Sequence, residues 1–209
     1  MLKKNNVLKS AEFNSVKKIV IFLHGYGSSW EDFPPSYKQS LSTEMKDTLV
    51  FAPNAPFKCE AGYGYQWFKL RDMSYNEIRD GLDTIARILS EYIDELSHEF
   101  ECDDVSVVGF SQGAMLSFES LNCSKNVKRV VAYSGMFVPT ADKQILAKNA
   151  KVLIVHSDDD SSVPYSNASL AKRNLESLEI PATIVTCHGI GHSISIEGLS
   201  AGIRFLNDL

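Results

Sequence analysis

The sequence has few of the features that mark disulfide-rich, membrane-spanning or nucleic-acid-binding proteins. Its 209 residues include four cysteines. No two of them form a CxxC pair, so neither a disulfide scaffold nor a zinc framework is indicated. No apolar run approaches the roughly 18 residues of a spanning helix, so we expect at most peripheral membrane contact. The net charge is −5 without a basic stripe, which disfavours nucleic-acid binding.

The cysteine content, the N-terminal stretch and the composition suggest where the protein is located and how many domains it has. Few cysteines without pairing motifs are typical of reduced thiols, and the charged stretch 1–18 is not followed by the apolar run of a secretory signal, so we expect a cytoplasmic protein. Neither repeats nor low-complexity segments interrupt the chain. With 44% hydrophobic and 22% charged residues, it is predicted to fold as a single domain over 1–209.

Six short apolar runs recur along the chain without a clean alternation of apolar and polar residues. This pattern is typical of strands that are covered on both faces. The runs are 18–24, 48–53, 105–110, 129–135, 151–157 and 182–189.

Helical patterns separate these runs. The stretch 75–100 has apolar residues at spacings of three and four, which predicts an amphipathic helix. Helices are also expected from Gln112, over 169–179 and over 195–209, the last weakened by its glycines. The β-α-β alternation predicts an α/β fold with a mostly parallel central sheet and helices on both faces. Ligands bind such sheets beyond the carboxyl ends of the strands.

The residues that follow three of the predicted strands carry the chemistry of nucleophilic catalysis. Ser111 lies in the motif GFSQG, three aspartates occupy 158–160, and His188 and His192 follow the last run. The chain order serine, acid, histidine is that of the α/β-hydrolase topology. A serine hydroxyl needs a base to take its proton, histidine is the natural base near neutral pH, and a carboxylate orients the imidazole.

The glycines around Ser111 fit a sharp strand-to-helix turn. Larger side chains at Gly109 or Gly113 would collide with nearby backbone. A helix that starts at Gln112 would direct N–H groups and its dipole at an oxyanion. The alternative is an ordinary Gly-Ser turn.

The aspartates and histidines can also be explained without a catalytic role. At least two of the three aspartates are expected to be solvated loop residues, and His188 reads better as a loop or core histidine. We expect a functional role for His192. A metal site made of His156, Asp158 and His192 lacks any known ligand spacing, so no metal is predicted.

Six sequence blocks together resemble the small phospholipase/carboxylesterase group of α/β-hydrolases, which includes acyl-protein thioesterases and bacterial carboxylesterases. The resemblance implies the α/β-hydrolase fold with a minimal cap, in which 71–80 forms a short cap at most. The blocks are IFLHGYG (21–27), APNAPF (52–57), QWF (66–68), GFSQGAML (109–116), HSDDDSSVP (156–164) and GIGHS (189–193).

The resemblance also implies roles for individual residues. The family pattern around the acid falls on Asp160, its base falls on His192, and Ser111 is the nucleophile. The oxyanion hole would use the backbone N–H groups of Tyr26 and Gln112, whose side chains would matter less. No cofactor is implied.

Substrate contacts are expected from two aromatic residues and from residues near the strand ends. Trp67 and Phe68 match a family pair near the acyl site, although both could be ordinary core aromatics. Met136 and Phe137, in a loop at 133–139, and Val163 are the further candidates. The sequence departs from the family at Ser157, where glycine is usual.

The predicted function is that of a serine hydrolase, a carboxylesterase that cleaves esters or thioesters of short- to medium-chain acyl groups through an acyl-enzyme. The substrate could be a small molecule, a lipid or an acylated protein, and the alternatives are an acyl-protein thioesterase or a lysophospholipase. A non-catalytic binding protein of the same fold is less favoured because all three catalytic residue types are present. Oligomeric state is left open.

Overall fold

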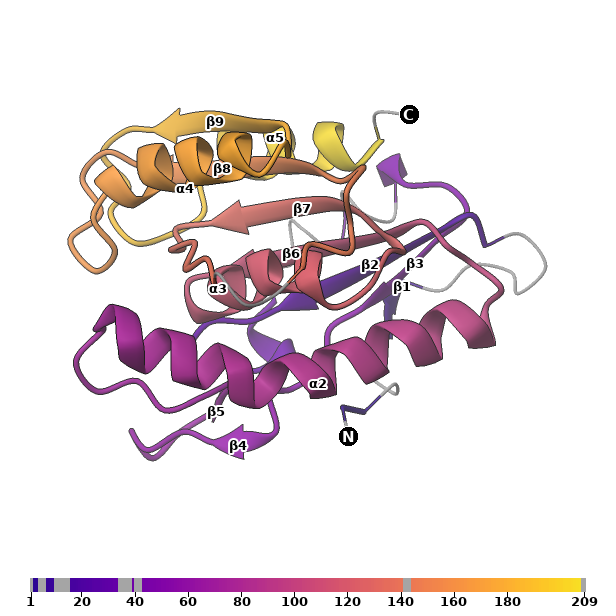
Figure 1. Ribbon diagram of the computed structural model, residues 1–209, viewed down its shortest axis with the longest axis horizontal. Helices are drawn as coiled ribbons and strands as arrows, with labels where there is room; N and C mark the ends of the chain where they lie inside the picture. Colours follow the sequence, from indigo (N-terminus) through magenta and orange to yellow (C-terminus); the bar gives the residue numbers. More distant parts are fainter. Residues whose placement is uncertain are drawn as a thin grey trace.

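A predominantly parallel sheet runs through the computed structural model, which describes residues 2–3, 7–9, 16–33, 39, 43–140 and 144–207 (Figure 1). In this part of the chain the sheet has seven strands in the order β1-β3-β2-β6-β7-β8-β9, and β1 alone pairs antiparallel to its neighbour. The strands are β1 (Val7–Lys9), β2 (Lys18–Leu23), β3 (Thr48–Phe51), β6 (Val105–Phe110), β7 (Val127–Tyr133), β8 (Lys151–Ser157) and β9 (Ala182–Cys187).

Both faces of the sheet are buried. In β2, Ile19 and Ile21 belong to a core shared with helices α2, α3 and α4, whereas Val20 and Phe22 belong to a second core shared with α5. This explains the unbroken apolar runs, since each strand needs apolar side chains on both sides. The prediction of a mostly parallel sheet with helices on both faces is confirmed. The helices are α2 (Tyr75–Glu99), α3 (Gln112–Glu119), α4 (Ser166–Ser177) and α5 (Ile196–Asn207).

The structure adds a small antiparallel hairpin that was not predicted, formed by β4 (Phe57–Lys58) and β5 (Tyr65–Gln66). Strand β1 was not predicted either. These strands have two or three residues each, too few for a hydrophobic period to be read. The stretch 71–80 forms no separate cap, because Ser74 caps α2 by accepting a hydrogen bond from the amide of Glu77.

The glycines of α5 do not interrupt it. A Cβ atom at Gly202 would lie 1.9 Å from the Tyr133 hydroxyl, and one at Gly198 would lie 2.8 Å from Val155. The helix therefore uses its glycines to approach the sheet closely. The expectation of a weakened helix overlooked this packing role.

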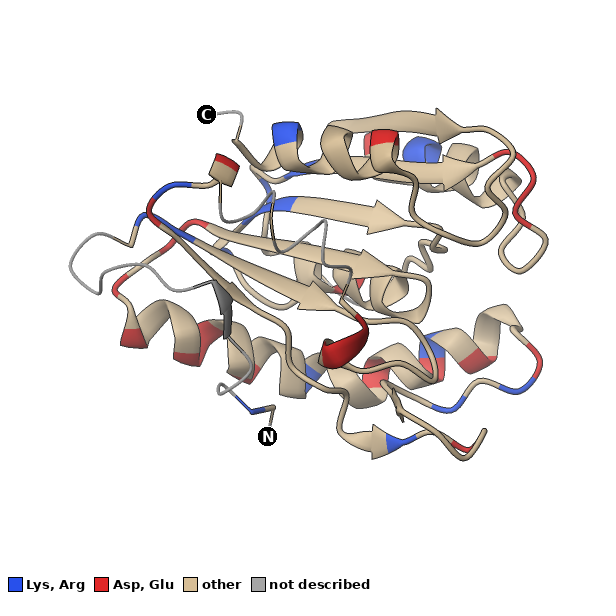
Figure 2. Ribbon diagram, turned by 180° about the vertical axis from the view of Figure 1, so that it is seen from behind, with Lys and Arg blue, Asp and Glu red and all other residues tan. Residues whose placement is uncertain are grey.

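Charged residues occupy the amino ends of several strands, among them Lys18, Arg129 and Lys151 (Figure 2). The carboxyl ends of the parallel strands lie together at the opposite end of the sheet. From β2 the chain continues to β3 on one side of β2, whereas β6 lies on the other side of β2. A crevice is expected at such a switch point. Among the described residues, no helix combines the length and apolar character needed to cross a bilayer.

Candidate active site

Ser111 occupies a strained turn between β6 and α3. Its backbone has φ 54° and ψ −117°, a conformation that L-residues rarely adopt and that costs about 1–3 kcal/mol. The turn is held at both ends, because the Ser111 amide donates to the carbonyl of Tyr133 at 2.9 Å and the Ser111 carbonyl accepts from Ala114 at 2.9 Å. The serine side chain is thus presented at the carboxyl edge of the sheet.

The two glycines that flank Ser111 permit a close approach of backbones. A Cβ atom at Gly109 would lie 2.1 Å from the carbonyl oxygen of Gly113, and one at Gly113 would lie 2.0 Å from that of Leu23. Real Cβ atoms do not come so near to backbone oxygen. The first turn of α3 is therefore pressed against the ends of both β6 and β2.

Three side chains from distant segments form a hydrogen-bonded chain. His192 Nε2 lies 2.9 Å from Ser111 Oγ, and His192 Nδ1 lies 2.8 Å from Asp160 Oδ2. Since a carboxylate only accepts hydrogen bonds, Nδ1 carries the proton and donates to Asp160. The Nε2 lone pair then faces the Ser111 hydroxyl, as a general base requires.

Asp160 is buried and receives several donors. Its Oδ1 accepts from the amides of Ser162 and Val163, each at 2.9 Å. Burial by itself would raise the pKa of Asp160, but the hydrogen bond from His192 and those from the two amides outweigh it and hold this pKa below its ordinary value. The group is therefore an ionised acceptor at neutral pH.

All three neighbouring aspartates bind the loop that carries His192. Asp158 Oδ2 lies 2.6 Å from His188 Nδ1, Asp159 Oδ1 accepts from the Gly191 amide at 2.9 Å, and Asp160 binds His192. We call these three contacts the aspartate clasp. Asp158 and Asp159 are exposed, as expected of loop residues, but they are more than solvated charges because each holds the histidine loop.

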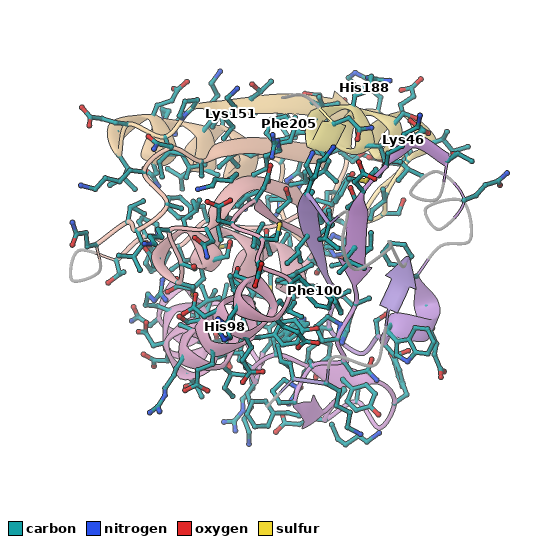
Figure 3. The ribbon with its side chains drawn as sticks, turned by 90° about the vertical axis from the view of Figure 1, so that its right-hand side faces the viewer. Lys46, His98, Phe100, Lys151, His188 and Phe205 are labelled. Atoms are coloured by element: carbon teal, nitrogen blue, oxygen red, sulfur yellow. The ribbon has the colours of Figure 1, made fainter. Side chains whose placement is uncertain are left out.

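Ser157, the residue that departs from the family pattern, belongs to the same arrangement. Its hydroxyl donates to Asp159 Oδ1 at 2.5 Å. His188, which was expected to be a loop or core histidine, lies at the outer edge of the molecule on the side of β9 and α5 (Figure 3), where it binds Asp158.

His156 lies beneath the acid. Its Nε2 is 2.8 Å from the carbonyl oxygen of Val163 and 3.3 Å from Asp160 Oδ2. Within the described segments no group of three or more His, Cys, Asp or Glu side chains is arranged to hold a metal ion.

His24 orients the peptide bond that would supply one oxyanion donor. The Ala55 amide donates to His24 Nε2 at 3.0 Å, so Nδ1 carries the proton and donates to the Gly25 carbonyl at 2.8 Å. Burial lowers the pKa of His24, which keeps the ring neutral. Since C=O and N–H point in opposite directions across a trans peptide, holding the Gly25 carbonyl also fixes the Tyr26 amide.

The turn before Tyr26 and the start of α3 both adjoin Ser111. A Cβ atom at Gly25 would lie 3.5 Å from the Ser111 Cβ, which brings the turn before Tyr26 against the nucleophile. Gln112 is the first residue of α3. Its amide has no acceptor within the helix, and the helix dipole points its positive end at this position.

The side chain of Gln112 is more important than the sequence suggested. It is fully buried; its Oε1 accepts from the Trp67 amide at 2.9 Å and its Nε2 donates to the Phe68 carbonyl at 2.8 Å. Trp67 in turn donates through its indole N–H to the His24 carbonyl at 2.8 Å. Gln112 therefore joins the serine turn to the segment that supports the His24 turn.

The five residues expected to contact substrate differ in their surroundings. Trp67 and Val163 have no exposed surface, so they support the site from within the core. Phe137 is nearly buried and packs on Phe118 with ring centroids 5.3 Å apart. Met136 is half-buried at the edge of this core. Phe68 lines a cavity of about 810 Å³ between the hairpin and α2.

The hairpin supports the turn that contains Tyr26. The Gly27 amide donates to the Tyr65 carbonyl at 2.9 Å, and the Tyr65 amide donates to the Ser28 carbonyl at 2.8 Å. The hydrogen bond with the Cys59 thiol raises the pKa of Tyr26 to about 12. This support was not predicted, although Gly62 and the aromatic residues around it are a recognisable hairpin signal.

Known proteins are similar to this chain over most of its length. The family described as phospholipase/carboxylesterase matches residues 6–209. Acyl-protein thioesterase 1 of Schizosaccharomyces pombe is 31% identical over 204 residues, which span 89% of this chain and 88% of that protein. Acyl-protein thioesterase 1 of Debaryomyces hansenii is 29% identical over 222 residues, spanning 96% and 94%.

Solved structures show the same fold. The crystal structure of esterase PE8 superimposes with a TM-score of 0.84 and 31% identity, covering 95% of both chains. The carboxylesterase of Bacillus cereus gives a TM-score of 0.76 at 19% identity, covering 95% of this chain and 91% of that one. The sheet and helices are those of the predicted α/β-hydrolase fold. The chain is an ester hydrolase that belongs to the phospholipase/carboxylesterase family.

Proposed function

We propose that this enzyme is a serine carboxylesterase that cleaves esters or thioesters of short- to medium-chain acyl groups. Ser111 is the nucleophile, His192 the general base and then the general acid, and Asp160 the group that orients His192. The observation that carries the proposal is the continuous hydrogen-bonded chain from Ser111 Oγ through the imidazole to Asp160.

The first half-reaction forms an acyl-enzyme. Ser111 Oγ bonds to the carbonyl carbon while its proton passes to His192 Nε2. The negative charge that develops on the carbonyl oxygen is stabilised by the amides of Tyr26 and Gln112, and loss of one such donor typically costs about 3 kcal/mol. The imidazolium then gives its proton to the leaving oxygen or sulfur as the bond to the acyl carbon breaks.

The second half-reaction releases the acid. A water molecule attacks the acyl carbon while His192 Nε2 takes a proton from that water. The proton passes to Ser111 Oγ when the bond between Oγ and the acyl carbon breaks. Asp160 stays ionised throughout, because its other oxygen is held by the amides of Ser162 and Val163. Ser111 and His192 are the side chains that gain or lose a proton in these steps.

Deacylation of lipid-modified proteins is the second candidate. It is favoured by the relatives at 29% and 31% identity, which are acyl-protein thioesterases. Lysophospholipids remain the third class of substrate. The same three side chains would serve all of these reactions, so the choice depends on how the acyl and leaving groups fit.

The test is direct. Purified enzyme is offered p-nitrophenyl esters of increasing chain length, a thioester-linked acyl peptide and a lysophospholipid at matched concentrations, and is labelled with a fluorophosphonate probe. Ser111→Ala should abolish both turnover and labelling. Ser177→Ala, a remote exposed serine in α4, is the matched control and should retain both. Wild-type rates in Ser111→Ala would refute the proposal.

A further inference from the structure

A second cavity opens directly beside the proposed general base. Its volume is about 380 Å³, and it reaches from the ring of His192 and from Gly25 to the short helix η2 (Trp30–Asp32). This cavity is separate from the larger one between the hairpin and α2, which includes none of the three proposed catalytic residues. An occupant of this cavity would contact His192, which lines it.

One wall of this cavity is aromatic. Phe22 and Phe33 meet edge to face with ring centroids 4.3 Å apart, and the ring of Phe110 lies against His192 with centroids 5.0 Å apart. Aromatic rings attract cations to their faces, and most strongly those cations that are weakly hydrated.

The lining of this cavity also includes the carboxylate of Asp32. Asp32 Oδ2 accepts hydrogen bonds from the Ser28 hydroxyl at 2.9 Å and from the Ser29 amide at 2.8 Å. The hydrogen bond from Ser28 is the main reason why the pKa of Asp32 is lowered. These partners are neutral, so the negative charge is not compensated by them. Across the described ranges, none of the ion pairs includes Asp32, and Figure 2 shows η2 as an acidic turn on this side of the sheet.

The position of the base indicates which half of the substrate lies here. In the proposed reaction His192 Nε2 must reach the leaving oxygen to protonate it, so the leaving group has to pass beside the imidazole. The cavity that includes the His192 ring and Gly25 is therefore the place for the alcohol half of an ester.

We propose that this cavity is the leaving-group subsite and that Asp32 makes it selective for esters of cationic alcohols, such as those that carry a quaternary ammonium group. This inference rests on the proposed esterase function. The aromatic wall contacts the methyl groups of such a cation while the carboxylate supplies the opposite charge. A leaving group with an anionic substituent at this distance would be repelled.

The experiment compares two esters of nearly identical shape. Butyrylcholine carries a trimethylammonium group where 3,3-dimethylbutyl butyrate carries a neutral tert-butyl group. For each ester, kcat/KM is divided by its rate of hydrolysis by hydroxide, which removes the difference in chemical reactivity. We expect this normalised kcat/KM to be about five- to tenfold higher for the cationic ester.

Two variants test whether the charge of Asp32 causes the preference for the cationic ester. Asp32→Asn keeps an oxygen that can accept from the Ser29 amide but removes the charge, and should bring the ratio close to one. Glu31→Gln makes the same change of charge one residue away, on a side chain that does not line the cavity, and should keep the wild-type ratio. Thermal unfolding of each variant checks its fold.

The wild-type enzyme supplies an independent measurement. An electrostatic preference must weaken as salt shortens the Debye length, so the ratio should fall between low and high ionic strength. An equal ratio in wild type and Asp32→Asn, or a ratio that salt does not change, would overturn the inference while the esterase function stands. If the enzyme hydrolyses neither ester but does turn over a p-nitrophenyl ester, this inference fails while the esterase function stands; if it turns over no ester or thioester at all, both fail.

Discussion

The carboxylate of Asp159 accepts a hydrogen bond from the backbone amide of Gly191 at 2.9 Å, one residue before His192. The neighbouring aspartates bind His188 and His192, so the aspartate clasp holds both ends of the histidine loop. Gly189 and Gly191 have φ values of 66° and 59°. The loop thus turns through conformations that glycine adopts easily, and the clasp selects one of them.

Removing the middle contact of the clasp should slow the chemical step. Asp159→Ala leaves the Gly191 amide without its acceptor, so His192 is less well aligned, and we expect kcat to fall about tenfold with KM nearly unchanged. Asp159→Asn retains an acceptor oxygen and should recover most of this loss. Steady-state kinetics with a p-nitrophenyl ester measures both. A wild-type kcat in Asp159→Ala would show that the contact has no role in positioning.

Ser157 allows a milder test of the same contact. Ser157→Gly introduces the residue usual in the family and removes one of the two donors to Asp159 Oδ1. Its kcat should lie between those of wild type and Asp159→Ala. A larger loss than in Asp159→Ala would instead indicate a role of Ser157 in the strand itself.

The buried side chain of Gln112 should contribute to stability separately from its amide. Gln112→Ala leaves the Trp67 amide and the Phe68 carbonyl unpaired inside the protein and creates a cavity, so the free energy of unfolding should fall by about 2–5 kcal/mol. Urea unfolding measures this. Gln66→Ala is the control, because Gln66 is also buried but its Oε1 has no hydrogen-bond partner among the residues that the structure describes. Equal losses in the two variants would contradict the assigned hydrogen bonds.

Asp160→Asn should lose activity chiefly because the His192 imidazole is no longer held in the tautomer that carries its proton on Nδ1. We expect kcat to fall about 10⁴-fold, as in other enzymes with this arrangement. Because the folded pKa of Asp160 is depressed below its ordinary value of 3.8, the carboxylate stabilises the fold above that pH and loses this contribution as the pH falls through the folded pKa. The stability difference between wild type and Asp160→Asn should therefore be full at pH 7 and decrease below about pH 4.

His188 gives the opposite dependence on pH. The hydrogen bond with Asp158 raises the pKa of His188 above its ordinary value of 6.5. Its contribution to stability is complete below pH 6.5 and disappears as the pH rises through the raised pKa. Urea unfolding of wild type, His188→Gln, Asp158→Asn and the double variant at pH 5.5 and pH 9 measures the interaction free energy, or coupling, between His188 and Asp158. Coupling that is as strong at the higher pH would show that protonation of His188 is not involved.

The sequence predicted the features that repeat along the chain or that obey a strict local geometry. The runs at 105–110 and 151–157 match β6 and β8 residue for residue, because a strand buried on both faces is apolar over most of its length. The turn around Ser111 was predictable because only glycine permits backbones to approach as closely as they do at Gly109 and Gly113.

The unpredicted features depend on contacts between segments that are distant in sequence. Gln112 looks like filler in its motif, and only the fold brings Trp67 to its side chain. The two-residue strands of the hairpin have no period, yet they hold the turn before Ser29. Asp158 and Asp159 have the composition of a solvated loop, and nothing local indicates the partners that β9 brings beside them.

The hydrogen bond between Ser111 and His192 joins residues 81 positions apart, and His192 arrives from β9, the last strand at one edge of the sheet. An edge element can open locally at a lower free energy than the whole domain. Such an opening would withdraw the base and leave the strained serine and its two neighbouring amides in place. Loss of turnover on heating should therefore precede the loss of helical signal, so that activity reports on the docking of one edge strand rather than on the fold as a whole.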